Sequence, residues 1–158
     1  MPGKIGRFML GAGGIIEYKE TGEILILKRD KTDFNSGFWE IPYGRIGQFE
    51  EIETALRREL LEETSTSGFK IIKLLRLWHI FRGTEKTAEN EIHGYSFWMR
   101  TESKQIELSP EHSEYRWVKA EEALKIVTLP GILKDIDLFI KHKQDPTLPP
   151  EIHTLGPA

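Results

Sequence analysis

The chain has 158 residues, 39% of them apolar and 30% charged, with a net charge of −3 at pH 7. This length suits one domain with its own core, and the composition is that of a folded globular protein and excludes a disordered chain. The acidic balance offers no basic field for nucleic-acid backbones, so we expect no nucleic-acid polymer as a partner.

The sequence also limits the compartment and the chemistry. There is no cysteine, which excludes disulfides, thiolate metal sites and cysteine nucleophiles. The sequence has neither an apolar run long enough for a membrane span nor a signal-peptide core. We therefore expect no membrane association and a cytoplasmic location.

The first third of the chain predicts two strands, a turn and a loop. Two β-rich runs, residues 11–18 and 23–30, flank a turn around Gly22. The stretch 31–50 is rich in Gly, Pro, Asn and Ser and follows no period, which predicts loop structure. A helix is expected from about Glu51 to Thr64.

The remainder alternates strands and helices. The expected elements are a long or bent strand at 69–82, a polar loop at 83–91, a strand at 92–100 with Tyr95, Phe97 and Met99 on one face, a short strand at 113–118, and helices at 120–127 and 130–143. This order predicts one mixed α/β or α+β sandwich domain over residues 1–143, followed by a Pro-rich extended tail at 144–158.

The helix predicted at 51–64 carries acids on its apolar side. On a helical wheel Glu59, Glu62 and Glu63 continue the stripe of Ala55 and Leu56. Carboxylates at this spacing repel by on the order of 3 kcal/mol per pair at an effective dielectric near 20. Either the acids pair with arginines on a solvated helix, or they hold a hard dication such as Mg²⁺ or Mn²⁺. The wheel favours the metal site, although periodicity alone leaves both interpretations open.

The residues around this helix identify a family. They fit the spacing G-x5-E-x7-R-E-U-x-E-E, where U is a bulky aliphatic residue, and are Gly44, Glu50, Arg58, Glu59, Leu60, Glu62 and Glu63. This pattern resembles the signature of the Nudix hydrolases. The segments 39–46, 11–16 and 108–124 are also similar to family segments, so the resemblance covers roughly Arg7 to Lys143.

The resemblance implies a fold, a reaction and a cofactor. The family folds as an α/β/α sandwich with a loop-helix-loop catalytic box, and it hydrolyses a nucleoside diphosphate linked to another group. Its cofactor is Mg²⁺ or Mn²⁺. Carried over by position, the metal ligands are the Gly44 carbonyl and the carboxylates of Glu59, Glu62 and Glu63. A homodimer is an oligomeric state found often in the family.

The resemblance also suggests supporting roles. Arg58 would orient the carboxylates by pairing with Glu50 or Glu62. The general base would be Glu59 or a loop acid. The candidates among the loop acids are Glu89, Glu91, Glu111 and Glu114. We favour Glu114, because it opens the short strand at 113–118. The histidines His79, His93 and His112 are isolated in the sequence and are expected to be structural or exposed.

The chain departs from the family pattern at three places. Ser65 stands where the box has a glycine, so we expect the helix to run on and turn at Gly68. Tyr43 replaces a glycine before Gly44, and is expected to narrow the approach to the phosphates. Gly47 stands where many members carry a glutamate, which leaves the entrance loop one acid poorer.

The substrate is indicated only by class. Arg29 is a candidate for a phosphate, and Trp39 and Tyr95 are candidates for stacking on a base, although aromatic residues on strands are more often core. By exclusion of subfamily cues, a nucleoside or deoxynucleoside triphosphate is favoured. The alternatives are a dinucleoside polyphosphate, a nucleotide sugar, or nucleotide sensing without catalysis. The first is kept because the segment 108–118 resembles the matching stretch of dinucleoside tetraphosphate hydrolases.

Overall fold

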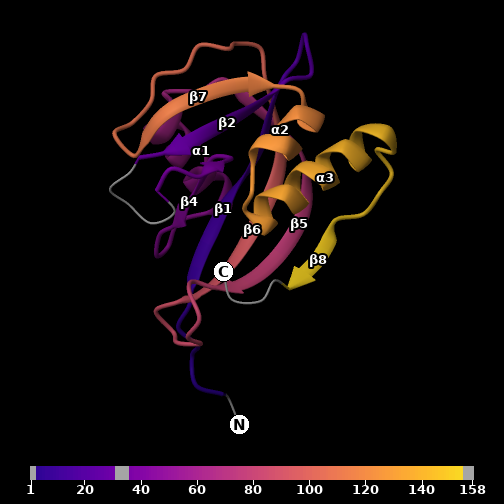
Figure 1. Ribbon diagram of the computed structural model, residues 1–158. Helices are drawn as coiled ribbons and strands as arrows, with labels where there is room; N and C mark the ends of the chain where they lie inside the picture. Colours follow the sequence, from indigo (N-terminus) through magenta and orange to yellow (C-terminus); the bar gives the residue numbers. More distant parts are fainter. Residues whose placement is uncertain (1–2, 31–35, 155–158) are drawn as a thin grey trace.

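A computed structural model describes residues 3–30 and 36–154. The elements, shown in Figure 1, are β1 (Met9–Tyr18), β2 (Ile24–Arg29), β3 (Trp39–Glu40), β4 (Tyr43–Ile46), α1 (Ile52–Thr64), β5 (Phe69–Phe81), β6 (Glu91–Thr101), β7 (His112–Val118), α2 (Ala120–Ile126), α3 (Pro130–Gln144) and β8 (Glu151–Thr154). Part of the predicted loop, residues 31–35, and the end of the predicted tail, residues 155–158, lie outside the described residues.

The strands form one mixed sheet in the order β3-β2-β1-β6-β5-β8. In addition, β4 pairs with β1 and β7 pairs with β2. The β1–β6 and β5–β8 pairs are parallel, and the other pairs are antiparallel. The long parallel register of β1 with β6, from Met9↔Ile92 to Tyr18↔Thr101, fixes the centre of the sheet.

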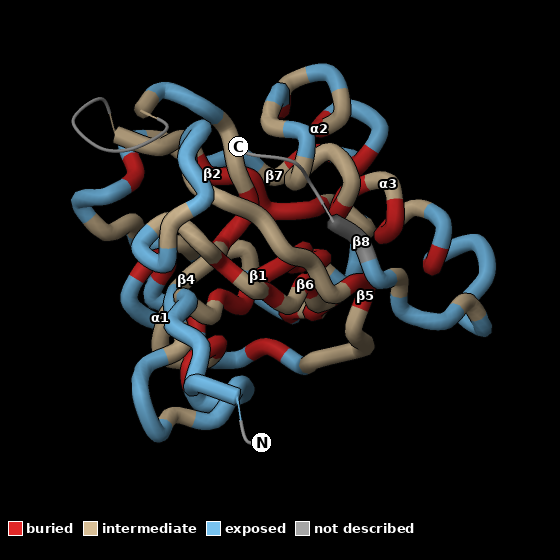
Figure 2. The backbone as a smooth tube through the Cα atoms, turned by 90° about the horizontal axis from the view of Figure 1, so that it is seen from below, coloured by how far each residue is buried: buried red, intermediate tan, exposed pale blue. Residues whose placement is uncertain are grey.

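Helices cover both faces of this sheet, because successive residues of a strand point to opposite faces and both faces are apolar. The core on the α2–α3 side includes Ile15, Ile24, Ile26, Trp98, Ala123, Ile136 and Phe139. The core on the α1 side includes Ala12, Ile16, Leu25, Leu27, Leu56, Leu60 and Met99. Figure 2 shows the buried residues concentrated in the strands between α1 and the pair α2 and α3.

The predicted sandwich of helices and a mixed sheet is therefore confirmed. The long strand at 69–82 is also confirmed as β5, and it is bent because its register with β6 shifts at two bulges. The turn at Gly22 has a positive φ of 71°, as a tight hairpin requires. In the described part of the chain, no helix is long and apolar enough to cross a membrane.

Two predicted irregular segments instead contain strands. The stretch 31–50 holds β3 and β4, which have only two and four residues and so leave no readable period in the sequence. They form by pairing with neighbouring strands. β3 pairs with β2, and β4 pairs with β1, where Gly44 lies opposite Ala12. Within the predicted tail, β8 pairs with β5, so this segment is an edge strand of the sheet.

The end of α1 differs from the sequence-based expectation. The helix stops at Thr64 and does not continue to Gly68. Ser65 takes the left-handed conformation, with φ 55° and ψ 21°, and its N–H donates to the Leu61 carbonyl at 2.9 Å. This is the geometry that glycine gives most easily, and it costs a residue with a Cβ about 1–2 kcal/mol. Ser65 thus performs the turn at the position where the family pattern has glycine.

A buried polar network ties β4, β5, β6 and α3 together. Arg76 of β5 is 2% exposed, and its Nε donates to Oδ1 of the fully buried Asp135 at 2.5 Å. The Tyr43 hydroxyl donates to Oδ2 of Asp135 at 2.6 Å and contacts Ser96 of β6. Burial, and then the charge of Asp135, raises the pKa of Tyr43 well above its usual value, which keeps the hydroxyl protonated as a donor.

We expect the Asp135→Asn substitution to destabilise the protein by about 3–5 kcal/mol, because it leaves the buried Arg76 without its counter-charge. Urea unfolding followed by circular dichroism measures this change. The control is Asp137→Asn on the same helix, which removes an exposed i,i+4 pair with Lys141 and should cost no more than about 1 kcal/mol. Equal effects of the two substitutions would contradict the assignment.

Candidate functional site

The helix α1 and the strand β4 come into close contact at Gly44. A Cβ added to Gly44 would lie 2.0 Å from Cδ of Glu59, so only a glycine lets the backbone of β4 lie against this carboxyl group. The apolar residues Leu56 and Leu60 hold α1 on the sheet and are each 1% exposed. The packing of the helix therefore places its acids beside the backbone of β4.

Two of the three predicted acids face inward. Glu63 is 4% exposed, and the side chain of Glu59 is 18% exposed. The side chain of Glu62 is 60% exposed, so the expectation that it faces the protein is wrong. On the helical wheel, Glu62 and Leu56 lie on opposite sides of Glu59. Glu62 is therefore at the rim of the contact between α1 and β4, and it is not covered by the sheet.

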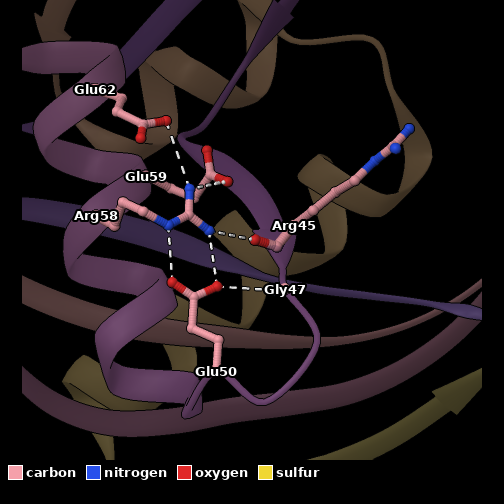
Figure 3. Close-up of polar contacts among 6 residues, drawn as sticks. All are labelled: Arg45, Gly47, Glu50, Arg58, Glu59 and Glu62. Carbon is pink, nitrogen blue, oxygen red and sulfur yellow. Dashed lines mark hydrogen bonds and ion pairs between the residues drawn. The ribbon is translucent and has the colours of Figure 1, made fainter.

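Arg58 organises the entrance to this site (Figure 3). Its Nε and a terminal nitrogen donate to the two oxygens of Glu50 at 2.8 and 2.9 Å. The other terminal nitrogen donates to Glu59 at 2.8 Å and to Glu62 at 3.5 Å. A further bond reaches the Arg45 carbonyl at 2.9 Å. The pairing of Arg58 with Glu50 and Glu62 agrees with the role that the family resemblance implies.

Glu50 precedes α1, and its loop turns its carboxylate toward Arg58 of the helix. Besides Arg58, it accepts a hydrogen bond from the Gly47 N–H at 2.8 Å. The bonds from Arg58, and then that from Gly47, lower the pKa of Glu50 to about 2. The bond to Glu50 is the main cause that raises the pKa of Arg58 above its usual value. Both groups therefore stay charged at neutral pH.

Glu63 is a buried carboxyl group with an unpartnered atom. Its Oε2 has no hydrogen-bond partner among the described residues. Burial raises its pKa well above the usual value, and the charges of Glu40, Glu59 and Glu111 raise it further, whereas Arg29 lowers it. A buried acid among other acids is costly unless a proton or a cation neutralises it.

The sequence analysis missed Glu40, whose charge acts on Glu63, and its contact with His112. Oε1 of Glu40 is 2.9 Å from a terminal nitrogen of Arg29 and 2.8 Å from Nε2 of the buried His112. These residues come from β2, β3 and β7, and only the pairing of the strands brings them together. No local spacing in the sequence could signal this group.

The structure separates the other predicted site residues. The charge of Arg29 acts on Glu63, so Arg29 lies near the acids of α1, where a residue that binds a substrate phosphate is expected. Tyr95 is in register with Ala12, which packs toward α1, so it shares the face of the site. Trp39, however, packs against the core on the α2–α3 side, on the opposite face of the sheet.

Glu114 also lies on that opposite face, which contradicts its expected place at the site. It is in register with Lys28, and the next residue but one, Arg116, is in register with Ile26 of the α2–α3 core. Lys28 and Arg116 both lie over the Trp39 ring, at 5.9 and 4.6 Å. The two-residue period of a strand therefore directs Glu114 away from α1.

Tyr43 does not narrow the approach to the site, as was expected from the sequence. Its ring points to the α3 side and bonds to Asp135 there, whereas the next residue, Gly44, faces α1. Alternation along β4 thus removes the bulky ring from the side on which the acids lie.

The residues on the α1 side fit a divalent cation. Glu63 offers a buried oxygen without a partner, Glu59 lies against the Gly44 backbone, and Glu62 lies at the rim. A set of carboxylate and carbonyl oxygens is what Mg²⁺ and Mn²⁺ prefer. A cation there would also remove the repulsion that raises the pKa of Glu63.

The raised pKa of Glu63 predicts a pH-dependent stability in the absence of metal. The folded protein keeps a proton on Glu63 at pH values where the unfolded chain has lost it, so this contribution is full below the usual pKa and is lost as the pH rises through the folded pKa. With chelator, we expect the Tm of the wild type to fall relative to Glu63→Gln as the pH rises above the usual pKa of a glutamate, about 4.3.

Thermal unfolding across this pH range measures the effect, and Glu62→Gln, which removes an exposed carboxyl group, is the control. Excess Mg²⁺ should abolish the fall of the wild-type Tm with rising pH, because the cation takes the place of the proton on Glu63. Parallel pH profiles of the two proteins in chelator would contradict the burial of a protonated Glu63.

The contact at Gly44 predicts a steric effect. Gly44→Ala places a methyl group against Glu59, and such overpacking should destabilise the protein by about 1–3 kcal/mol. It should also reduce the rise in Tm that Mg²⁺ produces. Gly68→Ala is the control, because a Cβ there meets nothing within 4 Å, and it should change stability by no more than about 0.5 kcal/mol.

Comparison with known proteins identifies the domain. Residues 8–136 match the model of the NUDIX domain. An RNA pyrophosphohydrolase of Wolbachia sp. subsp. Brugia malayi (strain TRS) is 33% identical over 117 residues, which cover 66% of this chain and 71% of the relative. An RNA pyrophosphohydrolase of Sulfurovum sp. (strain NBC37-1) is 33% identical over 123 residues, which cover 71% of this chain and 76% of the relative.

Among solved structures, a NUDIX hydrolase from Nitrosomonas europaea superposes with a TM-score of 0.78 at 16% identity, over 96% of this chain and 81% of that one. This likeness shows the fold. The domain match covers most of the chain and includes α1 with all of its box acids. The chain therefore belongs to the Nudix family, as a hydrolase that acts on pyrophosphate bonds.

Proposed function

We propose that the protein is a Mg²⁺- or Mn²⁺-dependent hydrolase of the 5′-triphosphate group of a nucleotide, either free or at the end of an RNA. The observation that carries the metal dependence is the buried, unpartnered oxygen of Glu63 among other acids. A nucleotide 5′-triphosphate contains the phosphoanhydride bonds on which this family acts, and its negative charge requires a cation before it can approach an acidic site.

The residues that would hold the cation are the Gly44 carbonyl, Glu59, Glu62 and Glu63. A bound dication would offset the charge that develops on the phosphate oxygens during cleavage. Glu63 supplies its charge from inside the protein, where solvent screens it least. Glu59 and Glu62 complete the set from neighbouring turns of the same helix.

Arg58 would position these carboxylates without touching the substrate. Its bidentate pair with Glu50 anchors the guanidinium to the loop before α1, and its remaining donors hold Glu59 and Glu62. Lysine cannot make this set of bonds, because its donors lie on one nitrogen. The same arginine therefore ties the loop to two members of the ligand set.

The general base is better assigned to Glu111 than to Glu114. Glu111 is exposed, and its charge acts on Glu63, whereas Glu114 lies on the other face of the sheet. The Glu111 carbonyl accepts a hydrogen bond from the Asp30 N–H at 2.8 Å, which holds its loop beside the end of β2. An exposed carboxylate at this edge can accept a proton from the attacking water.

Arg29 would meet a phosphate of the substrate. Its guanidinium is held by Glu40 on the same side of the sheet as Glu63. Tyr95 shares this face and stays a candidate for contact with the base. Trp39 does not share it and is withdrawn from the proposed substrate contacts.

The relatives named RNA pyrophosphohydrolase support the RNA end as one form of the substrate. The internal linkages of RNA are phosphodiesters, so a pyrophosphate bond occurs only in its terminal phosphate group. The net charge of −3 also disfavours extended contact with an RNA backbone. Recognition limited to the 5′ end reconciles these two observations.

A substrate panel tests the proposal. It contains nucleoside and deoxynucleoside triphosphates, an RNA oligonucleotide with a 5′-triphosphate, diadenosine tetraphosphate and ADP-ribose, each with Mg²⁺ or Mn²⁺, and the products are separated by chromatography. We expect preferential hydrolysis of a triphosphate substrate, no activity with chelator, and a loss of turnover by orders of magnitude in Glu63→Gln.

The matched control for this substitution is Glu53→Gln, on the exposed side of the same helix, which should keep full turnover. Preferential cleavage of diadenosine tetraphosphate or ADP-ribose would overturn the substrate class. Full activity of Glu63→Gln would overturn the metal site.

A further inference from the structure

Two histidines that are distant in the sequence face one another across the β5–β6 pair. His79 and His93 are direct partners in the antiparallel register. Their rings are stacked, with centroids 4.2 Å apart and planes 9° apart. The two histidines are isolated in the sequence, but the pairing of the two strands brings them together because they flank the same long loop.

Glu91 joins this pair. It lies two residues before His93 on β6, so both side chains leave the same face of the sheet. Its Oε1 is 2.8 Å from Nε2 of His79 and 3.4 Å from Nε2 of His93. One ligand atom from each residue lies within 4.8 Å of the other two, and in the described part of the chain this is the one such group of three.

The imidazole rings are held in place but are open to water. Phe8 packs its ring edge-on against His93 at 4.7 Å, and Phe81 lies 5.1 Å from His79. The side chains of His79, Glu91 and His93 are 31%, 27% and 42% exposed. Aromatic contacts that restrict the rings, with solvent on the remaining side, suit an ion that enters from solution.

The cluster is separate from the acids of α1. Ile46 of β4 is in register with Leu10 of β1, which is in register with His93 of β6. Two strand spacings of about 4.8 Å therefore separate β4 from His93, and a third separates it from His79. No residue of the proposed Mg²⁺ site contributes a ligand here.

We propose that His79, Glu91 and His93 bind a transition-metal ion of the Zn²⁺ class. Imidazole nitrogen suits Zn²⁺, Ni²⁺ and Cu²⁺, whereas Mg²⁺ prefers oxygen ligands only. Metal–ligand bonds of 2.0–2.1 Å at a tetrahedral angle require ligand atoms about 3.3 Å apart. The Glu91–histidine distances of 2.8 and 3.4 Å lie on either side of this value. The stacked rings have to tilt so that both Nε2 atoms point to one ion.

The protein supplies three ligands, and water or a small anion takes the fourth position. Such an ion joins β5 to β6 at the base of the loop at 82–90, because it holds a residue of each strand. It thereby stabilises the folded protein at this end of the sheet. The alternative without an ion is a hydrogen-bonded cluster, in which Oε1 of Glu91 accepts from an N–H group of each imidazole.

Isothermal titration with Zn²⁺ in the presence of excess Mg²⁺ tests the proposal on the full chain. We expect one Zn²⁺ per chain and a rise in Tm beyond the rise that Mg²⁺ alone produces. His79→Gln and His93→Gln should each weaken Zn²⁺ binding by at least about 10-fold, since each removes a ligand. Glu91→Gln should also weaken it, whereas Glu89→Gln, two residues earlier in the exposed loop, should not.

A second measurement does not depend on the folding of the variants. In the wild-type protein, the imidazole NMR signals of His79 and His93 should shift or broaden on addition of one equivalent of Zn²⁺. Stoichiometric binding with unchanged signals from these rings would overturn the site, as would equal Zn²⁺ affinity of the wild type and a folded His79→Gln/His93→Gln double variant. Absence of Zn²⁺ binding would favour the ion-free hydrogen-bonded alternative. The Mg²⁺ site and its proposed function do not depend on the result.

Discussion

The close approach of α1 to β4 is the constraint on which the site depends. Leu56 and Leu60 press the helix onto the sheet, and Gly44 lets the strand backbone lie against the Glu59 carboxyl group. The same packing buries Glu63 without a partner. Burial of that carboxyl group opposes folding until a proton or a cation neutralises it. The packing of the helix therefore creates a place where a cation would be favoured over a solvated carboxylate.

β4 is held from both faces, and this fixes the position of the Gly44 backbone. On one face Gly44 meets Glu59, and on the other the Tyr43 hydroxyl bonds to Asp135, which is in turn paired with Arg76. Tyr43, which stands where the family commonly has a glycine, thus attaches β4 to α3. The ligand side of the strand stays clear, because alternate residues of a strand point to opposite faces.

The two proposed metal sites differ in chemistry as well as in place. The set on α1 and β4 consists of oxygens, and the negative charge on it selects a hard dication. The set of His79, Glu91 and His93 contains two nitrogens and one carboxylate, which favours a softer ion. Because the preferences differ, each ion can occupy its own site when both are present. One would take part in hydrolysis, and the other would join two strands.

The sequence by itself determined the family and the box helix, because α1 is local and its spacing is visible in consecutive turns. It also predicted the ligand set that is proposed here. It also determined the sandwich, since the order of strand and helix patterns permits few arrangements. The tertiary structure decided which face each strand residue occupies, and this removed Glu114 from the site and joined His79 to His93. It also decided that Glu62 lies at the rim and that Ser65 ends the helix. These outcomes depend on register and packing between distant segments, and no local pattern carries that information.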